Sequence, residues 1–139
     1  MSSVTDVVEL WSAARHAIAT VERRLDTVLT ERLGLSFTTY AVLCTIAELG
    51  SKREVSQQHI ADALGIDKSN ASRHIEAAVQ AGLVSSAPSL QSRRSKSVGI
   101  TPAGRTALAA AEELVADFAS TLEPAAVRQT TRFLSGIGD

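Results

Sequence analysis

The chain has 139 residues, enough for one domain with a real core, and 45% of them are hydrophobic, which excludes a disordered polar chain. Aromatic residues make up only 4%, so aliphatic side chains must build the core, and this favours helices over a β-sandwich. The net charge is −1, no apolar run reaches the roughly 18 residues of a membrane span, and the start lacks the basic residues of a signal peptide. We therefore expect a cytoplasmic protein with no membrane partner.

The first predicted element is a long helix over about residues 4–32, which Gly34 ends. Its apolar residues recur at alternating intervals of three and four, the spacing of a heptad seam. The seam consists of Val4, Val7, Trp11, Ala14, Ile18, Val21, Leu25 and Val28. Such a helix packs either within one chain or also against a second copy, and its length favours a homodimer.

A helix-turn-helix is predicted after a second helix over 37–49. Ser56 is the expected N-cap of its first helix, Gly65 supplies the turn, and Asp67 caps its second helix, residues 68–81. With the apolar residues buried, the second helix presents a polar face with cations near its start. This face suits the major groove of duplex DNA, and a solvated helix face has the same composition. The candidate DNA contacts here are Ser56, Lys68, Ser69, Asn70, Ser72 and Arg73.

A change of period then predicts a β-hairpin, with strands at 83–86 and 97–100 and a polar tip at 87–96. The tip is basic and has no acidic residue. A basic loop can serve solubility alone, but cations on a wing can also reach the minor groove or the DNA backbone. The candidate contacts on this wing are Arg93, Arg94 and Lys96.

The charge distribution points the same way. Residues 52–105 hold eight cations and four anions, whereas the rest of the chain holds six cations and eleven anions. A basic centre between acidic ends is expected of a DNA-contacting segment on a scaffold that does not touch phosphate, and it is also compatible with an ordinary solvated surface.

Two further helices complete the chain. Thr101-Pro102 is a strong helix start, and Pro124 opens the last helix. The predicted fold is mainly α with a small β-hairpin wing, a winged helix-turn-helix. Residues 35–101 form the DNA-binding lobe, and residues 1–34 and 102–139 form a helical dimerisation region.

The segments IADALGIDKSNASRHIEAAVQAGLV (residues 60–84) and SRRSKSVGITPAG (92–104) resemble the MarR family of winged helix-turn-helix transcriptional regulators. The resemblance implies a homodimer, joined through its first and last helices, that binds a pseudo-palindromic operator. It places Ser69, Asn70, Ser72 and Arg73 on the recognition helix and makes Arg94 the wing arginine. Family members usually have an acidic residue at the position of Ser92, where it braces that arginine, so this chain departs from the pattern there.

The resemblance also implies a small-molecule effector. Many family members are repressors that a phenolic or aromatic carboxylate ligand releases from DNA, bound where the dimer helices meet the DNA-binding lobe. The candidate effector contacts are Arg15, His16 and Tyr40. Trp11 and Phe37 are candidates for the same cavity, although aromatic residues at helical spacing are more often core.

Other functions have less support in the sequence. No cofactor, metal site or catalytic constellation is expected, because the three histidines fall on different helices and phosphate loops and nucleophile elbows are absent. Cys44 is either a redox-sensing thiol or, on the apolar face of its helix, an inert core residue. A winged-helix module for protein–protein contact without DNA binding remains the other alternative.

Overall fold

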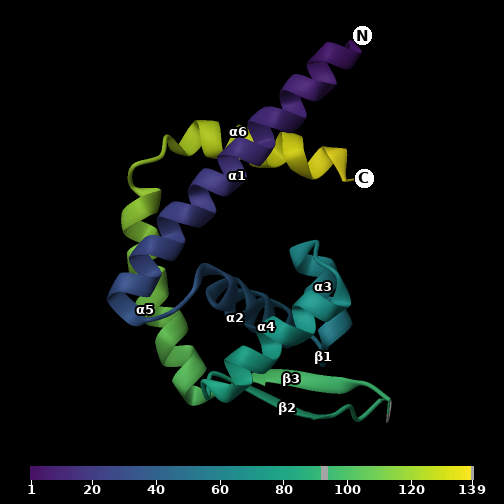
Figure 1. Cartoon of the computed structure of the whole chain (residues 1–139), viewed down its shortest axis with the longest axis vertical. Helices are drawn as coiled ribbons and strands as arrows, with labels where there is room; N and C mark the ends of the chain where they lie inside the picture. Colours follow the sequence, from purple (N-terminus) through teal and green to yellow (C-terminus); the bar gives the residue numbers. More distant parts are fainter. Residues whose placement is uncertain (92–93, 139) are drawn as a thin grey trace.

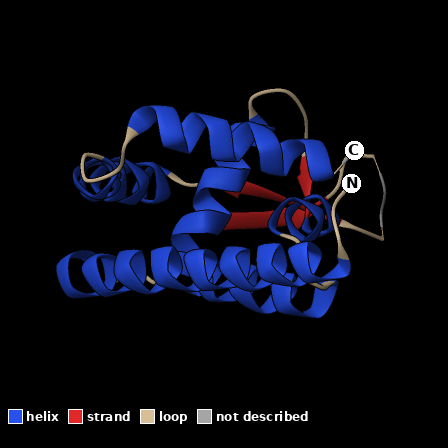
Figure 2. Ribbon diagram, turned by 90° about the horizontal axis from the view of Figure 1, so that it is seen from above, coloured by secondary structure: helices blue, strands red, loops and turns tan. Residues whose placement is uncertain are grey.

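Helices and a small three-stranded sheet make up the computed structural model, which describes residues 1–91 and 94–138. The elements are α1 (Val4–Leu33), α2 (Phe37–Gly50), β1 (Val55–Ser56), α3 (Gln57–Leu64), α4 (Lys68–Gln80), β2 (Val84–Pro88), β3 (Lys96–Ile100), α5 (Pro102–Ala119) and α6 (Pro124–Ile137). Figure 1 shows α1 and α6 extending away from a lobe that contains α2, α3, α4 and the sheet, with α5 running between the two parts. The strands are short beside the helices (Figure 2). The predicted fold class is confirmed.

The long first helix is well capped at both ends. Ser3 Oγ accepts the N–H of Asp6 at 3.1 Å, and the Ser3 N–H donates to Asp6 Oδ2 at 2.8 Å. Gly34, with φ of 64°, ends the helix. Only Leu25 and Leu29 of α1 are buried. The part of α1 before Leu25, roughly 30 Å long by helical rise, therefore has no buried side chain.

The turn of the helix-turn-helix forms through local interactions around Gly65. Gly65 adopts φ of 66°, which L side chains rarely adopt, and the Ile66 N–H returns to Ala61 O at 3.1 Å. The two helices meet over a buried core. Its members are Val42, Leu43, Ile46, Val55, Ile60, Ala61, Ala71, Ile75, Ala78, Val84 and Val98. This core fixes which face of α4 points outward.

The sheet differs from the predicted hairpin in two respects. Its order is β1-β3-β2, all antiparallel, so a third strand of two residues pairs with β3 beyond the hairpin. The hairpin strands cover 84–88 and 96–100 and pair from Val84↔Ile100 to Pro88↔Lys96, so the tip is shorter than predicted. A strand of two residues is too short to show an alternation of apolar and polar residues. Only its pairing with a distant strand defines it.

A smaller core joins α1, α2 and α5. Leu25, Leu29, Leu35 and Ala111 are buried there. At the start of α5, Thr101 ties the helix to the lobe: its N–H donates to Leu83 O at 3.1 Å, and its Oγ1 donates to Gly82 O at 2.7 Å.

Within the described ranges, no single helix has both the length and the hydropathy of a membrane span. Only α1 and α2 taken together, across a bend of 92°, pass that test.

Candidate nucleic-acid interface

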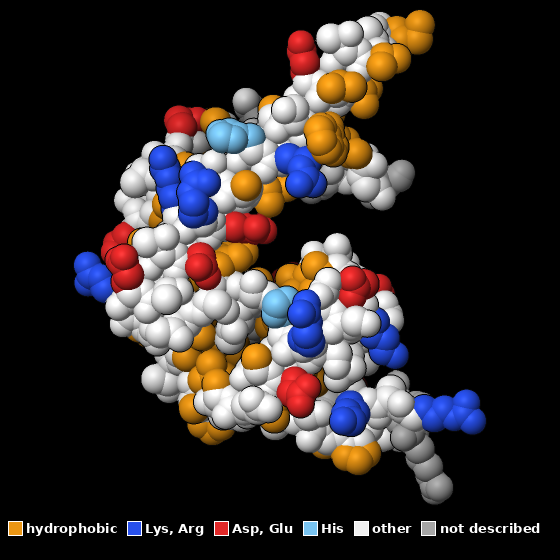
Figure 3. Space-filling model, in the orientation of Figure 1, with side chains coloured by type: hydrophobic (Ala, Val, Ile, Leu, Met, Phe, Trp, Pro, Cys, Tyr) orange, Lys and Arg blue, Asp and Glu red, His pale blue; other side chains and the backbone are white. Residues whose placement is uncertain are grey.

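Five of the nine predicted DNA contacts line one hollow on the lobe. It measures about 290 Å³, and it is lined by Ser56, Gln57, Gln58, Lys68, Ser72, Arg94, Ser95 and Lys96. These residues come from the start of α3, the first turns of α4 and the wing. Five of them are predicted contacts brought together from three separate elements. Figure 3 shows basic side chains on the lobe and the projecting wing, interrupted by a few acidic ones.

The start of α3 forms one wall of this hollow. Ser56 Oγ accepts the N–H of His59 at 3.1 Å, and the Ser56 N–H donates to His59 Nδ1 at 3.0 Å. The serine hydroxyl is thus held at the helix start with its own O–H still able to donate. Gln57 and Gln58, which the sequence analysis missed, occupy the first turn beside it. Polar side chains at such a position suit phosphate oxygens, and their place directly after the N-cap was the available signal.

A chain of hydrogen bonds runs along the recognition helix α4. Asp67 caps the helix through Oδ1, which accepts the N–H of Asn70 at 2.8 Å. The Asn70 side-chain Nδ2 donates to Asp67 Oδ2 at 2.9 Å, and Asn70 Oδ1 accepts from Arg73 Nη2. Ser69 and Arg73 are exposed, whereas Asn70 and Ser72 are half-buried. The predicted polar face therefore contains two groups: Lys68 and Ser72 at the hollow, and Asn70 and Arg73 joined to each other.

The wing is anchored from outside the hairpin. The Ser89 N–H donates to Ser95 O at 3.0 Å, which closes the hairpin beyond its last strand pair. The Leu90 N–H then donates to Glu54 Oε1 at 3.2 Å. Glu54 thus places a carboxylate against the wing from the segment before β1. The predicted contact Arg93 and the atypical Ser92 lie outside the described residues.

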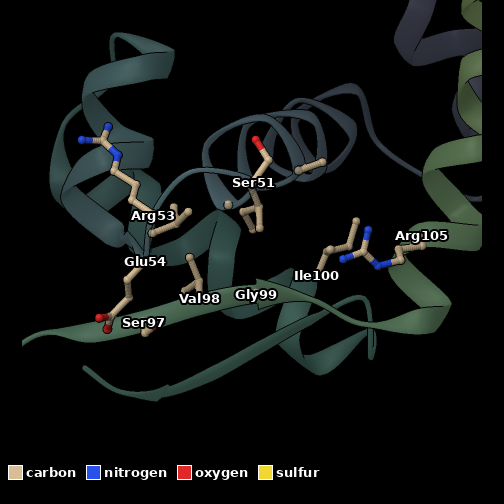
Figure 4. Close-up of a pocket in the computed structure, with 12 residues that line it drawn as sticks. Ser51, Arg53, Glu54, Ser97, Val98, Gly99, Ile100 and Arg105 are labelled. Carbon is tan, nitrogen blue, oxygen red and sulfur yellow. The ribbon is translucent and has the colours of Figure 1, made fainter. Parts of the chain in front are cut away.

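A second hollow, of about 310 Å³, lies behind β3 between the end of α2 and the start of α5 (Figure 4). Arg105 points across Ile100 there, whereas Arg53 and Glu54 point outward. None of the predicted DNA contacts lines it. The hollow beside α4, and not this one, is therefore the hollow that brings predicted contacts together.

Comparison with known proteins relates this arrangement to one family. A model of the MarR family matches residues 33–95, which include the helix-turn-helix and the wing up to Ser95. Over this segment the chain is similar to the MarR family. No curated protein matches it by sequence.

Several solved structures share the fold over nearly the whole chain. The transcriptional regulator BldR from Sulfolobus solfataricus has a TM-score of 0.79 at 21% identity, covering 97% of this chain and 99% of that one. A mutant MarR from E. coli complexed with operator DNA has a TM-score of 0.76 at 18% identity, covering 98% and 99%. BpsR from Bordetella bronchiseptica, whose DNA binding is regulated by 6-hydroxynicotinic acid, has a TM-score of 0.69 at 19% identity, covering 91% and 99%. At these identities the similarity establishes the fold.

The candidate effector residues do not meet within one protomer. Arg15 is exposed on α1 with its guanidinium carbon 5.4 Å from the ring centroid of Trp11, and His16 is exposed beside it. Tyr40 is half-buried and packs against the smaller core, to which α1 contributes Leu25 and Leu29. Arg15 precedes Leu25 by ten residues, about 15 Å along the helix. Among the residues with described positions, no group of three metal-ligating side chains forms a metal site.

Cys44 is half-buried on α2. Burial raises the pKa of its thiol, the hydrogen bond from the Tyr40 hydroxyl opposes this, and the charges of Glu112 and Glu48 add to the rise. Burial, and then the same hydrogen bond, raise the pKa of Tyr40. Because the thiolate is the form that oxidants attack, this environment disfavours the redox-sensing alternative.

Alkaline titration checks this assignment. The pKa of Cys44 is higher in the folded protein than in the unfolded chain, because folding favours the neutral thiol. This preference stabilises the folded state fully below the pKa of the unfolded thiol, about 8.5. The stabilisation is lost as the pH rises through the higher pKa of the folded protein. We expect iodoacetamide to modify Cys44 more slowly in the folded protein than in urea, with the folded rate still rising above pH 9. A folded thiol that reacts as fast as the unfolded one at pH 7.5 would restore the redox hypothesis.

Proposed function

We propose that the protein acts in the cytoplasm as a homodimeric repressor that binds a pseudo-palindromic operator and is released by a small aromatic or phenolic acid. The observation that carries the DNA part is the hollow beside α4, where cations from α4 and the wing, with the first turn of α3, converge on one outward surface. Cations and donors in this arrangement match a phosphate backbone on either side of a recognition helix in the major groove. The E. coli MarR complexed with operator DNA, which has the same fold, supports the proposal.

The homodimer part rests on exposed apolar surface. In the described chain, α6 has no buried residue, although Phe133, Leu134 and Ile137 lie on it. The seam of α1 is likewise open before Leu25. We propose that residues 1–34 and 102–139 pair with those of a second copy, which leaves residues 35–101 of each protomer to bind one half-site.

The proposed release by an effector rests on a protein of the same fold and on the position of Tyr40. BpsR shares the fold, and 6-hydroxynicotinic acid regulates its DNA binding. Tyr40 lies where α1, α2 and α5 meet, the junction between the proposed dimerisation region and the lobe. Arg15 and His16 are far along α1, so we propose that the second protomer brings them to the ligand.

Lys96→Gln tests the proposal through the salt dependence of binding. Lys96 is exposed and lines the hollow, and each dimer carries two copies. Each lost phosphate contact reduces the slope of log K against log salt by about 0.9, so we expect a slope shallower by about 2 and roughly tenfold weaker binding at 0.1 M salt. Fluorescence anisotropy with a duplex from the gene's own upstream region measures both.

The matched control is Arg24→Gln, which removes an exposed cation from α1, away from the hollow. It should leave the slope unchanged. Repeating the wild-type titration with 6-hydroxynicotinic acid tests the effector part, with a lower bound fraction expected. Equal slopes for wild type and Lys96→Gln would contradict the placement of DNA, and a wild type that fails to bind at low salt would contradict DNA recognition itself.

A further inference from the structure

Arg73 occupies the centre of the outward face of α4. An α-helix turns by about 100° per residue, and the buried residues Ala71, Ile75 and Ala78 mark its inward direction. By this geometry Arg73 points almost directly away from the core, and its side chain is exposed. Asn70 lies on the flank and is half-buried. A helix seated in the major groove therefore presents Arg73, rather than Asn70, to the base edges.

The side chain of Asn70 is engaged at both ends. Its Nδ2 donates to Asp67 Oδ2 at 2.9 Å, and its Oδ1 accepts from Arg73 Nη2. A carboxylate only accepts and a guanidinium only donates, so these partners fix which end of the amide is which. To read adenine, an asparagine uses both its amide N–H and its amide oxygen. Asn70 would have to disturb one or both of its present bonds to do so.

Arg73 keeps the donors that base recognition needs. A guanidinium has five N–H groups, and the bond to Asn70 uses one of them. A bidentate contact to O6 and N7 of guanine requires two, and it is the commonest specific contact in the major groove. Arg73 can therefore bind guanine without releasing Asn70, while Asn70 and Asp67 restrict the motion of the guanidinium and lower the entropy lost on binding.

We propose that Arg73 reads a guanine in each half-site, and that Asn70, held by Asp67, is a positioning residue for Arg73 rather than a base reader. This rests on the proposed function, because it assumes that α4 enters the major groove. Lys68 and Ser72 face the hollow shared with the wing, so they contact backbone. Ser69 is exposed on the same face as Arg73, and it has no side-chain hydrogen bond to Asn70 or Arg73 in the described residues.

The experiment is a binding selection from a randomised duplex library, with full-length wild type, Arg73→Ala and Asn70→Ala, followed by affinity measurements on the wild-type consensus. The wild type should select one guanine per half-site whose replacement by adenine weakens binding about 5- to 150-fold. Arg73→Ala should lose that preference. Asn70→Ala should still prefer guanine there, lose preference at no other position, and bind about 3- to 10-fold more weakly.

A double-mutant cycle separates positioning from independent contact. If Asn70 acts through Arg73, adding Asn70→Ala to Arg73→Ala should weaken binding less than twofold further. The control cycle pairs Ser69→Ala with Arg73→Ala, and its effects should multiply. Circular dichroism confirms that each variant is folded.

Three results would overturn the inference alone. They are a selected adenine whose preference vanishes in Asn70→Ala, a selected guanine that survives in Arg73→Ala, and effects of Asn70→Ala and Arg73→Ala that multiply. A wild type that retains no duplex from the library at 50 mM salt would overturn the proposed function as well, so the two failures are distinguishable.

Discussion

Replacing Gly104 by Ala is expected to lower the free energy of unfolding by about 3 kcal/mol, the largest effect of any single methyl group that we expect in this chain. A Cβ at Gly104 would lie 2.1 Å from Leu83 O and 2.8 Å from Ile100 Cγ1. The first of these is a backbone atom. It also accepts the N–H of Thr101 at 3.1 Å, so it is held in place.

Relief of this clash requires α5 to move away from the lobe. That movement would stretch the Thr101–Leu83 bond and the N-cap, in which the Gly104 N–H donates to Thr101 Oγ1 at 3.0 Å. A lost cap costs about 0.5–2 kcal/mol, a lost hydrogen bond about 0.5–1.5, and overpacking about 1–3, against about 1 gained from the helix propensity of Ala.

Gly50→Ala is the matched control. A Cβ at Gly50 would contact only Val55 Cγ2, at an ordinary 3.8 Å. Urea denaturation of both variants beside the wild type should show a change below about 1 kcal/mol for Gly50→Ala. If Gly104→Ala unfolded at the wild-type urea concentration, the close approach of α5 to Leu83 and to the end of β3 would be incorrect.

The second large effect is expected from the double variant Ile18→Glu/Phe133→Glu, which should be monomeric and bind operator at least about 1000-fold more weakly. Ile18 on α1 is 56% exposed, and Phe133 on α6 is 57% exposed. Neither contributes to the buried core of its own chain, so carboxylates there should leave the protomer folded while they charge the proposed interface. A monomer binds one half-site and loses the linked second contact. Sedimentation velocity and operator titration measure the two consequences.

Ala19→Glu controls for added charge on α1. Ala19 adjoins Ile18 in sequence but lies off the heptad seam and is exposed. This variant should remain dimeric and bind operator normally. A dimer that persisted in Ile18→Glu/Phe133→Glu would show that copies associate through another surface.

Much of the lobe could be predicted from sequence because its signals are local. The N-caps Ser56, Asp67 and Thr101 and the turn at Gly65 act within a few residues of themselves. Their spacing therefore places α3, α4 and α5 without knowledge of the rest of the fold. The exposure of Arg73 follows from the same spacing.

Features that depend on contacts between distant segments were less predictable. β1 exists only because Val55 and Ser56 pair with β3, more than forty residues later. The bond between Glu54 and the wing has the same long-range origin. The hydrogen bonds of Asn70 join residues close in the sequence. Which partners the side chain selects depends on its rotamer, and residue spacing does not predict a rotamer. The first-helix seam indicates a partner surface, whereas packing inside the chain uses Leu29, which is outside the seam.

The end of β2 also limits how copies of this protein can associate. In the described sheet β2 is an edge strand, and its residues Ser85, Ser86, Ala87 and Pro88 are exposed. Proline has no N–H to offer an incoming strand, and small hydroxyl side chains give such a strand little apolar surface. The wing can thus extend from the lobe without offering an edge that readily recruits another wing into a continuous sheet.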